Sequence, residues 1–442
     1  MNQTRMDDND RLLPIDAVRG IAMFFIGVSH ISFYLINDSG TLATHARAIG
    51  YVATPNFLLM SGLACGYQLA HSPTTATALR IMDRGLFAFL VGHLLVTASI
   101  VYMVPPGTAF EHDVITDSIG VLLCMAPLLK QVSAERLLWL GGAVYVLTSL
   151  FALAWHPATR LEIVFGALLL SINDGDMPDI GWTSPTLPYL GIFLLGVGLG
   201  KLIYLWRRGG RAEVLSARLS MAGAVAIGIG LALNIGRHFL KPVLAAHLAP
   251  KNWADVILTS INIRHDSPPT LGYGLFYGGI GVLLVGALGL LPRRTPATVW
   301  VRMTEKAAVI GRASFVSYVV QQWLIDFVPV WIGFDSWLTP TTCPVYLGAS
   351  TLVMYWAALY WGRRKGNRVL TLGLRPGAQW VDFRVGLFAT SVLVVVSLNV
   401  LALANAPRLM PGKLALVPPN PYPWAPEKVA RPPQDLVNHQ NL

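Results

Sequence analysis

The sequence predicts an all-α fold, a polytopic membrane helical bundle of about 10–12 transmembrane helices. Of the 442 residues, 54% are hydrophobic and only 13% are charged, a balance unlike that of soluble globular proteins. Apolar stretches of about 20 residues also recur along the chain, and each is long enough to cross a bilayer as a helix. These two observations exclude an ordinary soluble enzyme and make the lipid bilayer the first partner of this chain.

Each apolar stretch of membrane length predicts one helix. We expect helices at 12–36, 48–70, 85–104, 117–130, 137–155, 187–206, 219–239, 270–292, 307–331, 343–361 and 384–405. The apolar stretch at 161–172 is shorter, and we expect it to be re-entrant or interfacial. The membrane domain therefore covers 1–405. The remainder, 406–442, is rich in proline and is expected to be an extended, poorly ordered tail.

Charged residues between these helices predict the orientation of the chain. Cations gather in alternate loops: Arg80 and Arg84, Lys130 and Arg136, Arg207 to Arg211, Arg293 to Arg302, and Arg363 to Arg368. By the positive-inside rule, these loops and the N-terminus face the cytoplasm. The long intervening segments 156–186 and 240–269 then face outward, where they could hold a substrate. The net charge of +10 thus indicates membrane orientation, and no nucleic-acid partner is expected.

The cysteines predict neither a disulfide framework nor a metal site. Cys65, Cys124 and Cys343 are scattered singly in or beside apolar segments, without CxxC spacing. We therefore expect no metal cofactor.

Three ionisable residues share one stripe of the first predicted helix. Asp16, Arg19 and His30 are separated by three and then eleven residues, spacings that return to nearly the same helix face. The stripe covers about 21 Å of membrane depth. Ionisable groups inside a membrane are energetically costly and usually face a bundle interior, where they mark a pathway or a site. This stripe is therefore the first candidate for the functional site.

The residue types on the stripe suit acyl transfer from a phosphorylated donor. Arg19, near the cytoplasmic boundary, has a planar fork that makes paired hydrogen bonds to phosphate. His30, in the outer half, could deprotonate a hydroxyl or an amine. Two alternatives stay open: Asp16 and Arg19 could form only a structural ion pair, and His30 could be a hydrogen-bonded core residue.

Further motifs surround this stripe. They are Phe57 with Ser61 and Gly62, Asp83-Arg84-Gly85, the run from His265 to Tyr273, and the run from Ile310 to Tyr318, which contains Ser314. Together with Asp16-x-x-Arg19-Gly20 and Arg19-x10-His30, they resemble the transmembrane acyltransferase superfamily. That group includes the acyltransferase-3 proteins, the glucan succinylation proteins and relatives of the lysosomal heparan-α-glucosaminide N-acetyltransferase. One departure is that Gln321 and Gln322 stand where the family's late run usually ends in histidine.

The resemblance implies an acyl-CoA-dependent transmembrane acyltransferase. Its donor would be cytoplasmic acetyl-CoA or succinyl-CoA, and its acceptor a hydroxyl or amine of a sugar or glycan at the outer face. The catalytic residues implied are His30 as base or transient acyl carrier, Asp16 orienting Arg19, and His45 as a competing histidine whose alternative is a solvated loop residue.

The resemblance also implies binding residues. Arg19, Arg84 and Ser61 would contact the CoA, although Ser61 could instead only help two helices to pack closely. Tyr273 and Ser314 would contact the acceptor, and Tyr273 could instead anchor the membrane interface. The membrane implied is the bacterial cytoplasmic (inner) membrane, and a homodimer is compatible with the sequence.

The rival interpretation is a proton-coupled secondary transporter of a small organic solute. In it, Asp16, Arg19, His30 and Asp326 would form a proton relay. The sequence shows no internal repeat, which disfavours that class. Asp326 and His93 are further ionisable residues inside predicted helices, and each is expected to be a packed, hydrogen-bonded residue.

Overall fold

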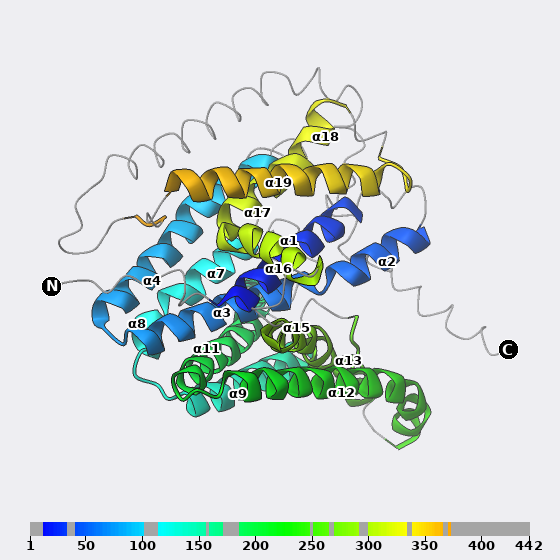
Figure 1. Ribbon diagram of the computed structural model, residues 1–442. Helices are drawn as coiled ribbons and strands as arrows, with labels where there is room; N and C mark the ends of the chain where they lie inside the picture. The colour runs from blue at the N-terminus through cyan, green and yellow to red at the C-terminus, as the bar shows by residue number, and fades with distance from the viewer. Residues whose placement is uncertain are drawn as a thin grey trace.

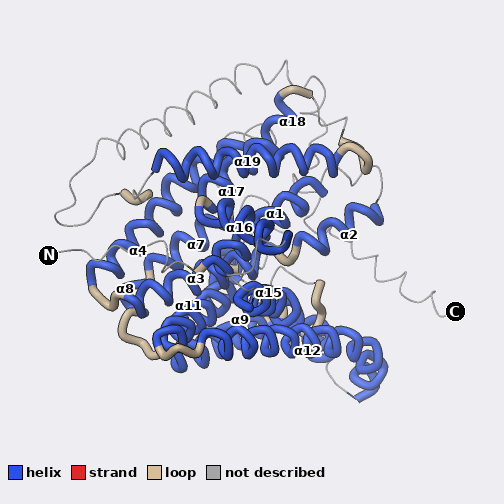
Figure 2. Tube along the Cα trace, in the orientation of Figure 1, coloured by secondary structure: helices blue, strands red, loops and turns tan. Residues whose placement is uncertain are grey.

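The helices pack side by side into one bundle (Figure 1). The computed structural model describes residues 12–32, 40–100, 114–155, 159–170, 185–247, 251–264, 269–290, 299–333, 338–365 and 370–372. Within these ranges the elements are helices joined by turns and loops, without a β-strand (Figure 2). The predicted all-α class is confirmed.

The elements follow one another along the chain with few long connections. The first half contains α1 (Leu13–Ile31), α2 (Gly40–Gly50), α3 (Ala53–His71), α4 (Thr75–Phe87), the π-turn η3 (Ala88–Gly92), α5 (His93–Thr97), η4 (Ala98–Ile100), α7 (Ile115–Cys124), α8 (Ala126–Leu129), α9 (Ala134–Ala154), α10 (Arg160–Leu170) and α11 (Thr186–Arg208). The second half contains α12 (Ala212–His247), α13 (Lys251–Ser260), α14 (Leu271–Tyr273), the π-turn η5 (Gly274–Gly278), α15 (Gly279–Leu290), α16 (Val299–Arg312), α17 (Ser314–Gln322), the π-turn η6 (Trp323–Phe327), α18 (Val328–Trp331) and α19 (Cys343–Lys365).

Six helical stretches among the described residues are long and apolar enough to cross a membrane. They are Leu13–Ile31, Thr44–His71, Ala134–Ala154, Thr186–Arg208, Ala212–Leu244 and Leu271–Leu290. Two further predicted spans are divided into shorter elements. The described part of 85–104 contains the π-turn η3, whereas 307–331 is divided at Ala313, between α16 and α17, and contains the π-turn η6. Large apolar side chains such as Trp139 on α9 and Phe239 on α12 are exposed, as expected of surfaces that face lipid. The chain is therefore an integral membrane protein.

Several predicted boundaries differ from the structure. The third helix begins at Thr75 rather than 85, because the Thr74 hydroxyl accepts the N–H of Thr77 and caps an amphipathic first half. The predicted outer segment 240–269 is largely helical, since α12 continues to His247 and α13 follows. The predicted helix at 384–405 and the tail at 406–442 lie outside the described residues.

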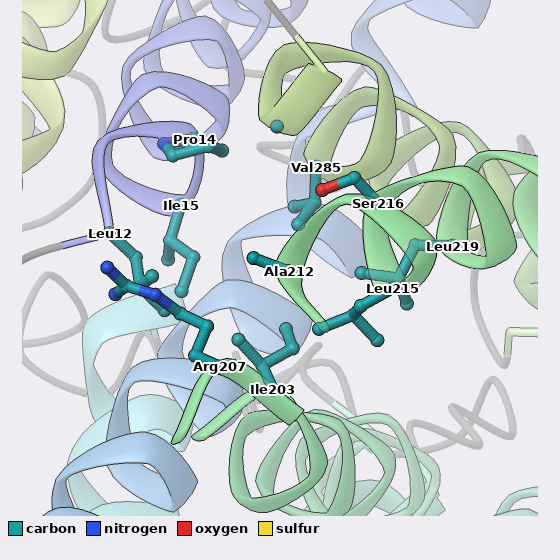
Figure 3. Close-up of a pocket in the computed structure, with 11 residues that line it drawn as sticks. Leu12, Pro14, Ile15, Ile203, Arg207, Ala212, Leu215, Ser216, Leu219 and Val285 are labelled. Carbon is teal, nitrogen blue, oxygen red and sulfur yellow. The ribbon is translucent and has the colours of Figure 1, made fainter. Parts of the chain in front are cut away.

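Two basic connections lie at the same end of the bundle as the start of α1. Lys130 Nζ donates to Thr75 Oγ1 over 2.9 Å, and Arg207 Nη1 donates to the hydroxyl of Tyr67 over 3.1 Å. Arg207 and Leu12 also line one small pocket, in which the arginine side chain reaches toward Leu12 (Figure 3). The positive-inside rule requires such a gathering of cations at one end.

A buried lysine holds this end together. Lys201 on α11 donates from Nζ to the carbonyls of Leu129, Lys130 and Val132, over 2.8, 3.1 and 2.6 Å. The last carbonyls of a helix have no partner within that helix, and here the ammonium group supplies one for α8. A lysine inside the bundle, which is otherwise costly, is thus fully used in packing.

Helix α1 lies in the interior of the bundle and touches α16 through glycines (Figure 1). A Cβ atom at Gly20 would overlap the carbonyl of Ala307, and one at Gly311 would overlap the carbonyl of Asp16. The two backbones therefore meet directly, as small residues allow in membrane bundles. This contact places the start of α17 beside Arg19.

Replacing Gly311 by alanine should separate α1 from α16. We expect a loss of about 1–3 kcal/mol of stability, the usual effect of forcing an extra carbon into a packed contact. Thermal unfolding of the purified protein in detergent measures this change. The matched control is Gly142→Ala on α9, where a Cβ meets no atom within 4 Å. Equal melting temperatures for both variants would show that the close contact has no energetic weight.

Candidate active site

Arg19 lies where α1 faces both α3 and α17. Its Nη2 donates to Ser314 Oγ over 2.5 Å, and its guanidinium carbon stands 5.8 Å from the centre of the Phe57 ring. Its Nε is buried and has no hydrogen-bond partner in the described part of the chain. A buried N–H without an acceptor is unfavourable, so this group is well placed to receive an anionic oxygen from a ligand.

His30, further along α1, pairs with the carboxylate of Asp326 in η6, the π-turn that follows α17. Its Nδ1 lies 3.4 Å from Asp326 Oδ1, in a part of the bundle where the Asp326 side chain is only 9% exposed. Catalytic hydrogen bonds are often this long before substrate binds. A carboxylate on Nδ1 orients the imidazole and stabilises its protonated form, as in established histidine bases. Sequence reasoning expected Asp326 to be hydrogen-bonded, but it did not identify the partner.

The π-turn η6 brings these two pairs into register. Eleven residues separate Arg19 from His30 on α1, whereas twelve separate Ser314 from Asp326 on the facing segment. A π-turn holds more residues than an α-helical turn. The π-turn η6 follows α17 and contains Asp326. The extra residue is thereby accommodated, and both partners face α1. Such turns frequently occur at functional sites.

Asp16 also has an ionic partner that the sequence did not predict. Its Oδ2 lies 3.5 Å from Arg312 Nε on α16, beside the close contact at Gly311. The sequence predicted that Asp16 orients Arg19. In the structure Asp16 interacts electrostatically with Arg19, Arg19 donates a hydrogen bond to Ser314, and the pair of Asp16 with Arg312 links α1 to α16.

One face of α3 connects the residues predicted to bind CoA. Phe57, Ser61 and Gln68 are spaced by four and seven residues and share that face. The guanidinium group of Arg19 lies over the ring of Phe57. At the other end of this face, Gln68 Oε1 accepts a hydrogen bond from Arg84 Nη1 over 3.5 Å. Ser61, buried, lies between them. The two arginines thus mark points about 16 Å apart along one helix.

The other two predicted residues occupy different surroundings. His45 is exposed on α2, in a helix and not in the expected loop. Tyr273 is 2% exposed, and its hydroxyl donates to the carbonyl of Tyr51 over 3.2 Å. Its ring also packs against Tyr51 and Tyr277, which favours an anchoring role for Tyr273.

Gln321 is a component of the site that sequence reasoning noted only as a departure. Its Nε2 donates to the carbonyl of Met23 over 2.8 Å, between the levels of Arg19 and His30 on α1. Its Oε1 is buried without a partner in the described residues. Two successive amides inside an apolar helix are costly, and that signal alone marks Gln321 and Gln322 for attention.

Among the residues that the structure describes, no group of three or more His, Cys, Asp or Glu side chains is placed to hold a metal ion. Cys65, Cys124 and Cys343 form no disulfide bond among the described residues.

Comparison with known protein families gives one match. Residues 11–232, half of the chain, match the catalytic domain of heparan-alpha-glucosaminide N-acetyltransferase. The matched stretch includes Arg19, His30 and Arg84, whereas Ser314 and Asp326 lie beyond it. No curated protein and no solved structure matches the chain. The predicted resemblance to membrane acyltransferases is thereby confirmed.

Proposed function

Because the chain belongs to the heparan-alpha-glucosaminide N-acetyltransferase family, we propose that it transfers an acetyl group from acetyl-CoA to an amine or hydroxyl of a sugar. The observation that carries this proposal is the pairing of Arg19 with Ser314 and of His30 with Asp326 inside the bundle. One pair offers a cation to the donor, and the other offers a base to the acceptor.

The α3 face supports a binding path for the donor. Arg84 lies nearer the basic end of the bundle, and Arg19 lies about 16 Å deeper along α3. Guanidinium groups bind phosphate through paired, charge-assisted hydrogen bonds. In this proposal CoA enters from the cytoplasmic end, its phosphates meet these arginines, and its thioester arm extends past Ser61 toward His30.

The chemistry assigned to His30 is general base catalysis. The imidazole accepts the proton of the acceptor amine or hydroxyl as its nitrogen or oxygen attacks the thioester carbonyl. The carbon–sulfur bond then breaks, and the CoA thiolate takes the proton from the imidazolium. Asp326 stabilises that imidazolium. A transient acetyl group on His30 is the other route compatible with this geometry.

Acceptor-dependent release of CoA tests this function. The purified protein in detergent is mixed with acetyl-CoA or succinyl-CoA, with and without glucosamine, and free CoA is followed over time. We expect release with acetyl-CoA and glucosamine together, and much less with succinyl-CoA. A transporter has no gradient to use in detergent. If no acyl-CoA binds, the transporter interpretation gains support and flux measurements in vesicles follow.

A further inference from the structure

The π-turn η6 leaves one backbone carbonyl without a donor from its own helix. In an α-helix the carbonyl of Leu324 would accept the N–H of Val328, four residues further on. In η6 that N–H binds the carbonyl of Trp323 instead. A π-turn would direct the N–H of the next residue to Leu324, but this residue is Pro329, which has no N–H. The Leu324 carbonyl therefore needs a donor from another element.

A tyrosine in the first turn of α19 supplies that donor. The hydroxyl of Tyr346 donates a hydrogen bond to the carbonyl of Leu324. An unpaired carbonyl is costly inside a membrane bundle, where water is not at hand to replace the missing partner. Leu324 lies two residues before Asp326, so this bond fixes the part of η6 that presents the carboxylate to His30. The Tyr346 hydroxyl also interacts electrostatically with Asp326 itself.

Side chains next to Tyr346 hold the same three segments together. A Cβ atom added at Gly27 of α1 would lie 3.0 Å from Leu347 Cδ1 on α19 and 3.4 Å from Ile325 Cδ1 in η6. Leu347 and Ile325 belong to one buried apolar cluster, against which Tyr346 packs. Gly27 comes three residues before His30, which is about one helical turn. The start of α19 therefore lies at the level of this histidine.

We propose that Tyr346 is a positioning residue that holds Asp326 against His30, an inference that rests on the proposed function. Its hydroxyl occupies the carbonyl that the π-turn leaves free, and it thereby stabilises the turn that brings Asp326 into register with α1. Tyr346 acts through Asp326 and needs no contact with either substrate. It should therefore control kcat and leave the binding of the donor unchanged.

Loss of the hydroxyl favours a different pairing within the turn. The nearest replacement donor for the Leu324 carbonyl is the N–H of Val328, which would have to leave Trp323. That exchange restores α-helical geometry and removes the extra residue of the turn. Asp326 would then rotate away from His30. A displacement of about 1 Å near a reacting centre can cost about 10²-fold in rate.

Replacing Tyr346 by phenylalanine tests this assignment, with acetyl-CoA as donor and glucosamine as acceptor. The variant keeps the ring that packs against the apolar cluster and removes only the hydroxyl. We expect kcat to fall about 10- to 100-fold, with the KM for acetyl-CoA close to that of the wild type.

Tyr145→Phe is the matched control. Tyr145 is a buried tyrosine on α9 whose hydroxyl donates to the carbonyl of Thr270 over 2.6 Å. The control therefore loses the same kind of hydrogen bond at a distance from η6, and it should keep the wild-type kcat. Melting temperatures of the two variants compare their effects on stability.

A double-mutant cycle with Asp326→Asn distinguishes positioning from a general structural effect. If Tyr346 acts through Asp326, Tyr346→Phe should lower kcat no further in a protein that already carries Asp326→Asn. The proposal is overturned if the two losses multiply, if Tyr346→Phe alone keeps the wild-type kcat, or if Tyr145→Phe lowers kcat as much.

A measurement without chemistry separates this inference from the proposed function. The ¹⁵N NMR signal of His30 Nδ1 responds to the hydrogen bond with Asp326, and it is identified as the signal that His30→Ala lacks. It should shift in Tyr346→Phe in the same direction as in Asp326→Asn, and stay in place in Tyr145→Phe. If the wild type transfers no acetyl group, the proposed function fails, yet this shift still supports the positioning role. An unshifted signal in Tyr346→Phe overturns that role.

Discussion

Replacing Asp326 by asparagine should lower kcat for acetyl transfer by about 10²–10⁴-fold, the range that general acid–base catalysis contributes. The amide keeps the size of the side chain but removes the charge that stabilises the protonated His30 imidazole. An amide can also donate to Nδ1 and so favour the wrong tautomer of the ring. Steady-state rates at saturating acetyl-CoA measure this effect, and the KM for acetyl-CoA should stay close to that of the wild type.

Asp255→Asn is the control for this change. Asp255 is exposed on α13, so the same loss of one carboxylate should leave kcat unchanged. Wild-type kcat in Asp326→Asn would contradict the role of the pair with His30. A matched fall in both variants would point to a general effect of charge.

Replacing Arg19 by lysine should raise the KM for acetyl-CoA about 10- to 100-fold, because hydrogen bonds to charged groups contribute about 1.5–3 kcal/mol. Lysine retains the positive charge but loses the planar fork and the Nε–H that is unpaired in the structure. The concentration dependence of CoA release, together with calorimetric binding of acetyl-CoA, measures this change.

Arg218→Lys provides the corresponding control. Arg218 is exposed on α12 and stacks at 4.8 Å over the Trp206 ring, away from the α3 face. It should bind acetyl-CoA as the wild type does. A large loss of kcat in Arg19→Lys with undiminished affinity for acetyl-CoA would place Arg19 in the chemical step and not in donor binding.

The sequence was sufficient for the features that depend on local periodicity. Apolar runs of membrane length predicted the helical class, and the spacing of Arg19 and His30 placed both on one face of α1. These features follow from the geometry of a single helix and need no knowledge of the tertiary structure.

The partners of these residues could not be predicted in the same way. Ser314 and Asp326 lie 295 and 296 residues away from Arg19 and His30 in the sequence. Their alignment depends on the glycine contact between α1 and α16 and on the extra residue in η6, neither of which hydropathy detects. Arg312, a further ionic partner of Asp16, was missed for the same reason.

Helix interruptions were also beyond hydropathy analysis. The stretch 117–130 reads as one apolar run, yet α7 ends at Cys124 and α8 follows after Met125. Lys201 satisfies the carbonyls at the end of α8, and that partner comes from α11. Breaks of this kind are stabilised by distant side chains, so only the packed structure shows where they fall.

Side-by-side measurement of His30→Ala and His45→Ala tests the central claim most directly. Each variant is purified in detergent and assayed for glucosamine-dependent CoA release from acetyl-CoA, with its melting temperature as a check on folding. The account predicts that His30→Ala loses acceptor-dependent release, whereas His45→Ala, altered on the exposed surface of α2, retains it. Loss of activity in His45→Ala with retention in a folded His30→Ala would contradict the account and move the active site to α2.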